Sequence, residues 1–158
     1  MNSALYLLDL MYLFSQITIV PIIFVWGFIV FRKGFSKFQL IFLLPLILFL
    51  ITTALFPYLA RENVKNILSE NILIFDVTGF EDENKILTSL RTLKFVPSNN
   101  SHPVGGKIDI KIVTNETRKN LFMYKDYLMN NKYWLYDDEY RYSTNNNIGY
   151  IIIKERND

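Results

Sequence analysis

Few side chains in this chain of 158 residues have the type and spacing that catalysis or metal binding needs. The one histidine, His102, follows Ser101 directly. Neighbours in an extended segment point to opposite sides, so the two do not form a catalytic pair. A metal site with one histidine needs carboxylates at fixed spacing around it, and none is evident. We therefore expect His102 to be a surface loop residue.

Two short motifs look chemical and have ordinary explanations. Gly105, Gly106 and Lys107 look like part of a phosphate-binding loop, but such a loop follows a strand and opens a helix, and this one precedes a strand. Asp137, Asp138 and Glu139 are three acidic residues in succession, which favours a hairpin turn with solvated charges. A weak calcium site is the alternative, since oxygen ligands are present without a loop template.

The composition removes further classes of chemistry. The chain has no Cys, which excludes a disulfide scaffold and a thiol nucleophile. Pairs of carboxylates for glycoside chemistry can be chosen in many ways and mean nothing without geometry. We therefore expect no enzyme activity, no cofactor and no metal. The segment 61–158 carries equal numbers of basic and acidic residues, which argues against a nucleic-acid partner.

The most informative feature is a concentration of aromatic residues between positions 124 and 150, interleaved with charged residues. Strand propensity and core filling account for some of these rings, and a well-decorated small sheet is the alternative reading. Tyr, Trp and Arg also supply most hot spots of protein interfaces. We expect a protein-binding surface made from Tyr124, Tyr133, Trp134, Tyr136, Tyr140, Arg141 and Tyr142.

The elements that must position these residues begin with two apolar runs, 11–31 and 38–60, neither of which contains a charge. At about 1.5 Å per residue each helix would span about 30 Å, the hydrocarbon thickness of a bilayer. Neither run has a polar face, and a helix that is apolar all round needs lipid or a large core. We expect two transmembrane helices, with Pro21 and Pro45 as mild kinks inside them.

The short gap 32–37 between the runs makes the helices an antiparallel hairpin. It holds Arg32, Lys33 and Lys37, and basic short loops stay on the cytoplasmic side. A cleaved signal peptide would need a basic start and a shorter run, so we favour a retained helix. The expected location is the bacterial inner membrane, with both termini and residues 61–158 in the periplasm.

The polar part, 61–158, reads as an α+β domain. We expect a helix over 61–70 that extends the second membrane helix, a strand over 71–80 and a helix over 81–95 that Pro97 ends. A loop over 98–106, a strand over 107–113 and an antiparallel meander follow, with one or two helices packed on the mainly antiparallel sheet. Within the meander we include YRY (140–142) as a strand piece. The expected domains are 1–60 and 61–158.

Three function classes follow from this architecture. The first is a membrane-anchored protein-binding module, such as a bacterial immunity protein that neutralises a toxin or an accessory subunit of a membrane complex. The second is a ligand-sensing effector, in which the α+β domain controls the hairpin and the hairpin forms a homo-oligomer. The third is an enzyme acting on cell-envelope material, which would need carboxylates converging in a cleft. We favour the first, with the lipid bilayer and another protein as partners.

Overall fold

The structure is a computed structural model, and it describes residues 3–34, 36–80, 82–95 and 101–153. Contacts between Cα atoms divide the chain into two compact units, Met1–Phe56 and Pro57–Asp158. The border falls inside a helix, four residues before the border that we expected from the sequence.

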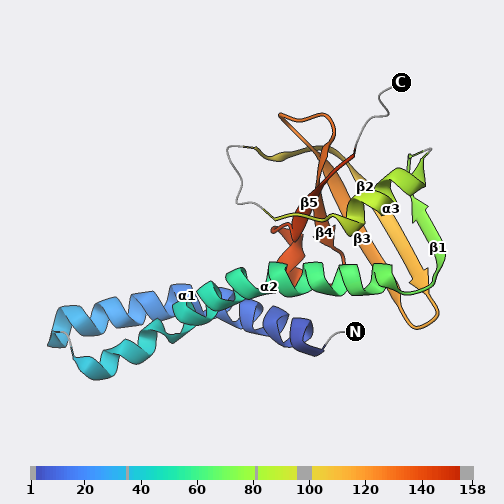
Figure 1. Cartoon of the computed structure of the whole chain (residues 1–158). Coiled ribbons are helices and arrows are strands. Elements are labelled where there is room, and N and C mark those ends of the chain that lie inside the picture. Colours follow the sequence, from blue (N-terminus) through green and yellow to red (C-terminus); the bar gives the residue numbers. More distant parts are fainter. Residues whose placement is uncertain (1–2, 35, 81, 96–100, 154–158) are drawn as a thin grey trace. The chain divides into compact units, whose positions relative to one another are not determined.

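The first unit consists of apolar helices. It contains α1 (Ser3–Lys33), a short 3-10 helix η1 (Lys37–Leu43) and the first part of α2 (Leu44–Ser69) (Figure 1). In the part of the chain that the structure describes, two helical stretches are long and apolar enough to cross a membrane, Ser3–Lys33 and Gln39–Ser69. Only 6% and 22% of their most apolar windows are buried within the chain, so most of this apolar surface is exposed in the structure.

The second apolar run differs from the expected uninterrupted helix, because it starts as η1 and becomes α-helical at Leu44. Pro45 therefore lies in the first turn of α2, directly after the 3-10 turn, and not in the interior of a continuous α-helix. The turn before η1 uses Gly34 with a positive φ of 74°. Gln39 fixes this turn, because its side chain accepts from Ser36 N (3.2 Å) and donates to Gly34 O (3.1 Å).

Hydroxyl groups inside the two apolar helices bond to their own backbone. Ser15 Oγ donates to Tyr12 O (2.7 Å), and Thr18 Oγ1 donates to Phe14 O (2.8 Å). In α2, Thr53 Oγ1 makes the same bond to Phe49 O (2.9 Å). These bonds reach back three or four residues and satisfy a hydroxyl without water.

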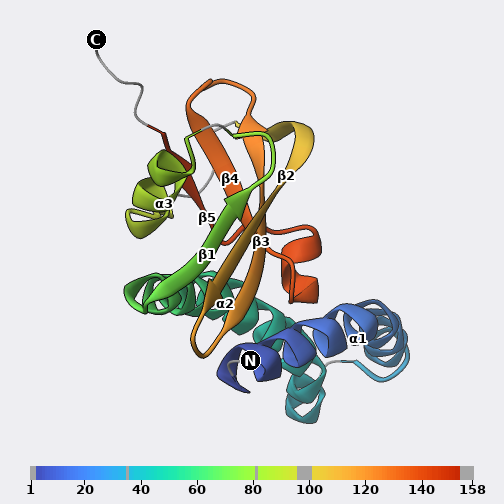
Figure 2. The same cartoon turned by 90° about the vertical axis from the view of Figure 1, so that its right-hand side faces the viewer.

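The second unit is α+β, as the sequence predicts (Figure 2). After the end of α2, the chain forms a five-stranded sheet with strand order β1-β2-β3-β4-β5, in which every neighbouring pair is antiparallel. Helix α3 (Glu83–Arg91) connects the first two strands, and a short 3-10 helix, η2 (Arg141–Thr144), connects the last two. The strands are β1 (Ile72–Val77), β2 (Pro103–Thr114), β3 (Arg118–Asp126), β4 (Lys132–Asp137) and β5 (Gly149–Ile152).

One face of the sheet, here called the inner face, holds the core. Along each strand, every second side chain points to this face, and those at its centre are almost fully buried. Helix α3 contributes Ile86 and Leu90, and it contacts both edge strands, so the sheet curls around the helix. The inner-face residues buried to 1% exposure or less include Ile110, Ile112, Leu121, Met123, Leu135 and Ile151.

Two parts of the polar segment differ from the sequence prediction. The piece YRY is not a strand: Arg141 starts η2, and the residues after Asp137 leave the sheet because Glu139 N donates to the Asp137 carboxylate (3.2 Å) and turns the chain. Residues 103–106 belong to β2 rather than to a loop, since a bulge with Gly105 at φ 84° lets the strand continue. Pro97 lies outside the described residues, and α3 ends earlier, at Arg91.

Gly149, at the start of β5, sits where no side chain fits. A Cβ there would lie 2.5 Å from Lys94 O, which accepts a hydrogen bond from Tyr150 N (2.8 Å) and cannot retreat without breaking it. We expect Gly149→Ala to lower the free energy of unfolding by about 1–3 kcal/mol.

The matched control is Gly106→Ala, because a Cβ at Gly106 meets nothing within 4 Å; it should stay within about 0.5 kcal/mol. The chain has two tryptophans, so in a Trp26→Phe background the fluorescence of buried Trp134 reports the second unit alone. Unfolding of the full chain in detergent by urea measures both variants. Equal midpoints for the two would show that β5 and the Lys94 segment are not packed as described.

Candidate functional site

The structure separates the residues that we expected to bind a protein. Trp134, Tyr136, Tyr140 and Tyr142 are buried, with 2 to 6% of each residue exposed. Tyr124 and Tyr133 are half-buried, and Arg141 is exposed. Four of these rings therefore serve the interior of the unit in this structure, and the binding role of the set stays a prediction.

An aromatic cluster nevertheless covers the second face of the sheet, here called the outer face. Phe122 and Tyr136 face each other across β3 and β4, with stacked rings 5.0 Å apart. Tyr124 meets both rings edge-on. Trp134 and Tyr150 form a second edge-on pair, 5.9 Å apart. These rings pack on one another, which explains why Phe122, Trp134 and Tyr136 are buried.

Two lysines place their ammonium groups over rings of this aromatic cluster. Lys107 Nζ lies 4.6 Å from the centre of the Phe122 ring, and Lys132 Nζ lies 4.0 Å from that of Trp134. Lys107 also forms ion pairs with Asp109 (3.0 Å) and Asp138 (3.5 Å). A groove of about 390 Å³ lies at Lys107 and its two carboxylate partners. It is lined by Asp76, Thr78, Lys107, Asp109, Ile110, Lys111, Asn120, Leu121 and Asp138.

A buried charge cluster lies on the inner face. Lys119 is 1% exposed, and its Nζ lies 2.7 Å from Asp137 Oδ2 and 2.9 Å from Glu139 Oε2. The same Nζ lies 4.8 Å from the Tyr140 ring. Burial raises the pKa of Asp137 to about 6, although Lys119 opposes the shift. One ammonium serves two carboxylates, so the fully buried one is left with incomplete compensation.

This cluster corrects the expectation for the acidic run. Asp137 is not a solvated turn residue, because it ends β4 with its carboxylate inside the unit. Asp138 follows the expectation, since it is exposed and pairs with Lys107, and Glu139 is also exposed although it pairs with Lys119. Asp137 and Glu139 therefore share Lys119, whereas Asp138 pairs with Lys107. Among the described residues, no group of three or more His, Cys, Asp or Glu side chains could hold a metal ion.

A second buried carboxylate, Asp126, closes the loop between β3 and β4. Its Oδ1 accepts from the backbone N–H groups of Leu128 and Met129, both at 2.9 Å. Its Oδ2 accepts from Lys132 Nζ (3.2 Å) and from Ser101 Oγ. Burial by itself would raise the pKa of Asp126, but these hydrogen bonds outweigh it and lower the pKa to about 2.

The structure also places His102 and the Gly105–Gly106–Lys107 motif, the other candidates from the sequence. His102 is exposed, as expected, and its ring stacks on Tyr127 at 4.8 Å. Gly105 and Gly106 form the bulge of β2, and Lys107 after them pairs with carboxylates. No helix follows these glycines, so the described geometry offers no phosphate loop.

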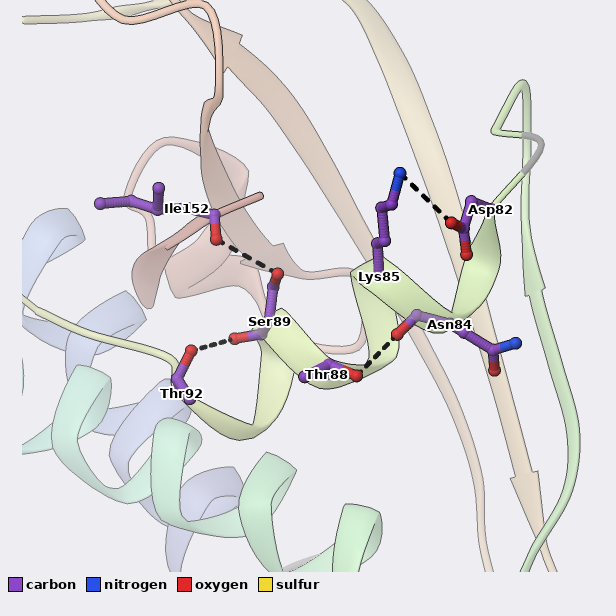
Figure 3. A pocket seen from close by; sticks show the side chains of 7 residues that line it. All are labelled: Asp82, Asn84, Lys85, Thr88, Ser89, Thr92 and Ile152. Atoms are coloured by element: carbon purple, nitrogen blue, oxygen red, sulfur yellow. Dashed lines mark hydrogen bonds and ion pairs between the residues drawn. The ribbon is translucent and has the colours of Figure 1, made fainter. Parts of the chain in front are cut away.

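A polar groove of about 510 Å³ runs along α3, next to the end of β5 (Figure 3). Lys85 pairs with Asp82 at 3.3 Å across its rim. Ser89 Oγ donates to Ile152 O (3.2 Å) and thereby joins the helix to β5. The remaining lining groups are a carboxamide and hydroxyls, from Asn84, Thr88 and Thr92.

Comparisons with protein-family models, with curated proteins and with solved structures found no match to this chain. Function must therefore be argued from its residues. The sequence patterns did not single out Lys119 and Asp126, two ion-pair residues that are each only 1% exposed. A signal existed for Lys119, because it stands in the same period-two frame as Leu121 and Met123 and so points inward.

Proposed function

We propose that this chain is a membrane-anchored protein-binding module. Its two apolar helical stretches cross a bilayer as a hairpin, and Pro57–Asp158 forms the binding unit. Two features support the anchor: the apolar side chains of α1 and α2 remain largely exposed within the chain, and their hydroxyls bond to backbone carbonyls instead of needing water. Both features favour lipid as the surrounding medium.

The proposed orientation follows from the basic residues. Arg32 and Lys33 end α1, and Lys37 begins η1, so the three charges flank one tight turn. The positive-inside rule then favours a cytoplasmic turn. Both termini and the α+β unit lie outside, which in a bacterium is the periplasm.

One observation carries the protein-binding part, namely the outer face with its preformed aromatic cluster and its flanking charges of both signs. Half-buried Tyr124 and Tyr150 have ring surface that a partner can contact. Neighbouring rings already hold these side chains, so binding would cost little side-chain conformational entropy. Asp109 lies opposite Phe122 on the neighbouring strand, and Lys111 lines the same groove as Asp109, so the two supply a polar rim. Rings inside a mixed polar rim suit a protein partner.

Two roles fit such a module. One is an immunity protein that neutralises a toxin at the periplasmic face of the inner membrane. The other is an accessory subunit of a membrane complex. Both need a stable docking surface and a tether, and neither needs catalytic groups.

The test is co-purification of the full chain from membranes of its own host cell. We expect one protein to accompany it in a fixed stoichiometry. The pair Tyr124→Ser and Lys111→Glu should remove that protein, because both changes lie on the outer face. The matched control is Lys85→Glu, which changes the same charge on α3 at the inner side of the sheet.

Two outcomes contradict the proposal. One is a partner that remains bound to the outer-face variant and leaves with the α3 variant. The other is full-length chain found in the aqueous fraction after lysis without detergent, since this would remove the anchor. A reporter enzyme fused to the C-terminus tests the periplasmic orientation separately.

A ligand-sensing effector is the second candidate, and the groove along α3 is the observation that favours it. Hydroxyls, a carboxamide and an ion pair line a space large enough for a small polar molecule. In this role the hairpin would form a homo-oligomer that responds to the ligand. A small molecule that co-purifies with the wild type and is lost in Thr88→Val would favour this candidate over the first.

A further inference from the structure

Three consecutive apolar residues form the tip of the loop between β3 and β4. Tyr127 and Leu128 are each 62% exposed, and Met129 is 45% exposed. We call these three residues the hairpin tip. Figures 1 and 2 both show this loop at one end of the sheet, with the β2–β3 turn at the other. Large apolar side chains exposed side by side mark a contact surface more often than isolated ones do.

The hairpin tip is held in place from several directions. Asp126 accepts the N–H groups of Leu128 and Met129, and Lys132 N closes the loop onto Met129 O (3.1 Å). On the other side Tyr127 N donates to His102 O (3.0 Å), and the two rings stack. The apolar side chains are therefore presented on a fixed backbone. Docking such a tip orders little additional chain, which lowers the entropic cost of binding.

The charges around the hairpin tip favour an apolar surface with anionic groups. Segments 101–104 and 125–132 contain two lysines and one carboxylate. That carboxylate, Asp126, is 1% exposed and already paired with Lys132. Lys125 supplies the remaining half-exposed positive charge. The tip thus combines Tyr, Leu and Met with a cation and shows no exposed carboxylate of its own.

This combination matches the interface of a lipid bilayer. Tyrosine is enriched at headgroup level, aliphatic side chains enter the acyl region, and lysine is attracted to anionic lipid. Three side chains alone bind weakly, but the tip belongs to the same polypeptide as the apolar helices. A tether of this kind raises the local concentration enough to make a weak contact effective.

We propose that the hairpin tip inserts into the interface of the same bilayer that holds the two apolar helices, and so fixes the orientation of the α+β unit. The inference rests on the membrane anchor of the proposed function. It assigns the tip to lipid and leaves the outer face of the sheet for the protein partner. Tip insertion would hold that face in a defined direction instead of letting the unit rotate.

The experiment uses the absence of Cys, so that one introduced cysteine takes one label. Leu128→Cys, Leu73→Cys and Phe24→Cys are each labelled with an environment-sensitive dye. Leu73 in β1 is the matched control, because its 57% exposure resembles the 62% of Leu128. Each full-length chain is placed in nanodiscs of phosphatidylcholine and phosphatidylserine, and a lipid-bound quencher is added.

We expect quenching at positions 24 and 128 and none at 73. In the Leu128→Cys chain, adding Tyr127→Ser and Met129→Ser should shift the ratio of inserted to free tip about tenfold or more toward free, since most of the apolar area is lost. Quenching at 24 alone, or equal quenching at 73 and 128, overturns the tip inference and leaves the anchor intact. No quenching at 24 overturns the anchor and the tip inference together.

Discussion

Replacing Lys119 with Met should lower the free energy of unfolding of the second unit by about 3–5 kcal/mol at pH 7. Met keeps the length of the stem and removes the ammonium that opposes the raised pKa of Asp137, so Asp137 must either stay charged without a counter-ion or take up a proton at pH 7. The cost comes from that isolated carboxylate more than from the lost ion pair. Urea unfolding followed by Trp134 fluorescence in the Trp26→Phe background measures it.

The sheet offers a closely matched control in Lys107→Met. Lys107 also lies between two carboxylates and beside an aromatic ring, but 40% of its side chain is exposed. Water screens that pair, so we expect a loss of about 1 kcal/mol or less. Similar losses in the two variants would mean that water reaches Lys119 and that the cluster is not enclosed.

A second substitution should restore much of the loss. In Lys119→Met with Asp137→Asn, neither partner is charged, and the double variant should be more stable at pH 7 than Lys119→Met alone. A double-mutant cycle then gives the coupling between the two groups. No recovery would place the cost in the packing of Met rather than in the unpaired carboxylate.

The pH dependence of the wild type has a defined direction. The pKa of Asp137 is raised to about 6 in the folded state, so folding favours its protonated form. Its contribution to stability is therefore full below about pH 4, the pKa of an unfolded Asp, and is lost as the pH rises through 6. Asp137→Asn should flatten the stability profile between these values.

The α+β class and the two apolar helices were predictable because each rests on a local pattern. The alternation of Ile108, Ile110 and Ile112 predicted a strand with one buried face, and the helical spacing of Ile86, Leu87 and Leu90 predicted α3. Neither prediction needed to know which strands pair. Patterns of this kind survive folding because they match the geometry of a single element.

Burial of individual polar and aromatic residues was not predictable in the same way. Asp137 looked like a turn residue because it stands before two acidic neighbours, yet its partner Lys119 is eighteen positions away on another strand. The rings of Trp134 and Tyr136 became buried through neighbours on β3 and β5. These outcomes depend on strand register, which the sequence pattern alone left open.

Asp126→Ala should cause the other large loss, about 3 kcal/mol or more, because it removes four hydrogen-bond acceptances and leaves Lys132 without its carboxylate. Lys132 is only 12% exposed, so its charge finds little water in place of the lost partner. The matched control is Asp109→Ala, where the carboxylate is 60% exposed and pairs with Lys107; we expect about 1 kcal/mol or less.

Acid titration separates this carboxylate from Asp137. Hydrogen bonds lower the pKa of Asp126 to about 2 in the folded state, so its contribution is present above about pH 4 and is lost as the pH falls toward 2. Asp126→Asn keeps the shape and removes the titration, and its unfolding should change less than that of the wild type in this range. An unchanged acid limb would show that other carboxylates dominate it.

Asp126→Ala also links stability to the proposed tip contact. The substitution leaves Tyr127, Leu128 and Met129 in the sequence and frees the two backbone N–H groups that hold them. Inserting a loosened tip would require ordering it first, so lipid quenching of a label at position 128 should decrease while that at position 24 stays constant. The measurement is made at a temperature where Trp134 fluorescence shows the variant folded. Full quenching at 128 in the folded variant would mean that apolar composition suffices and that the Asp126 hydrogen bonds serve only the fold.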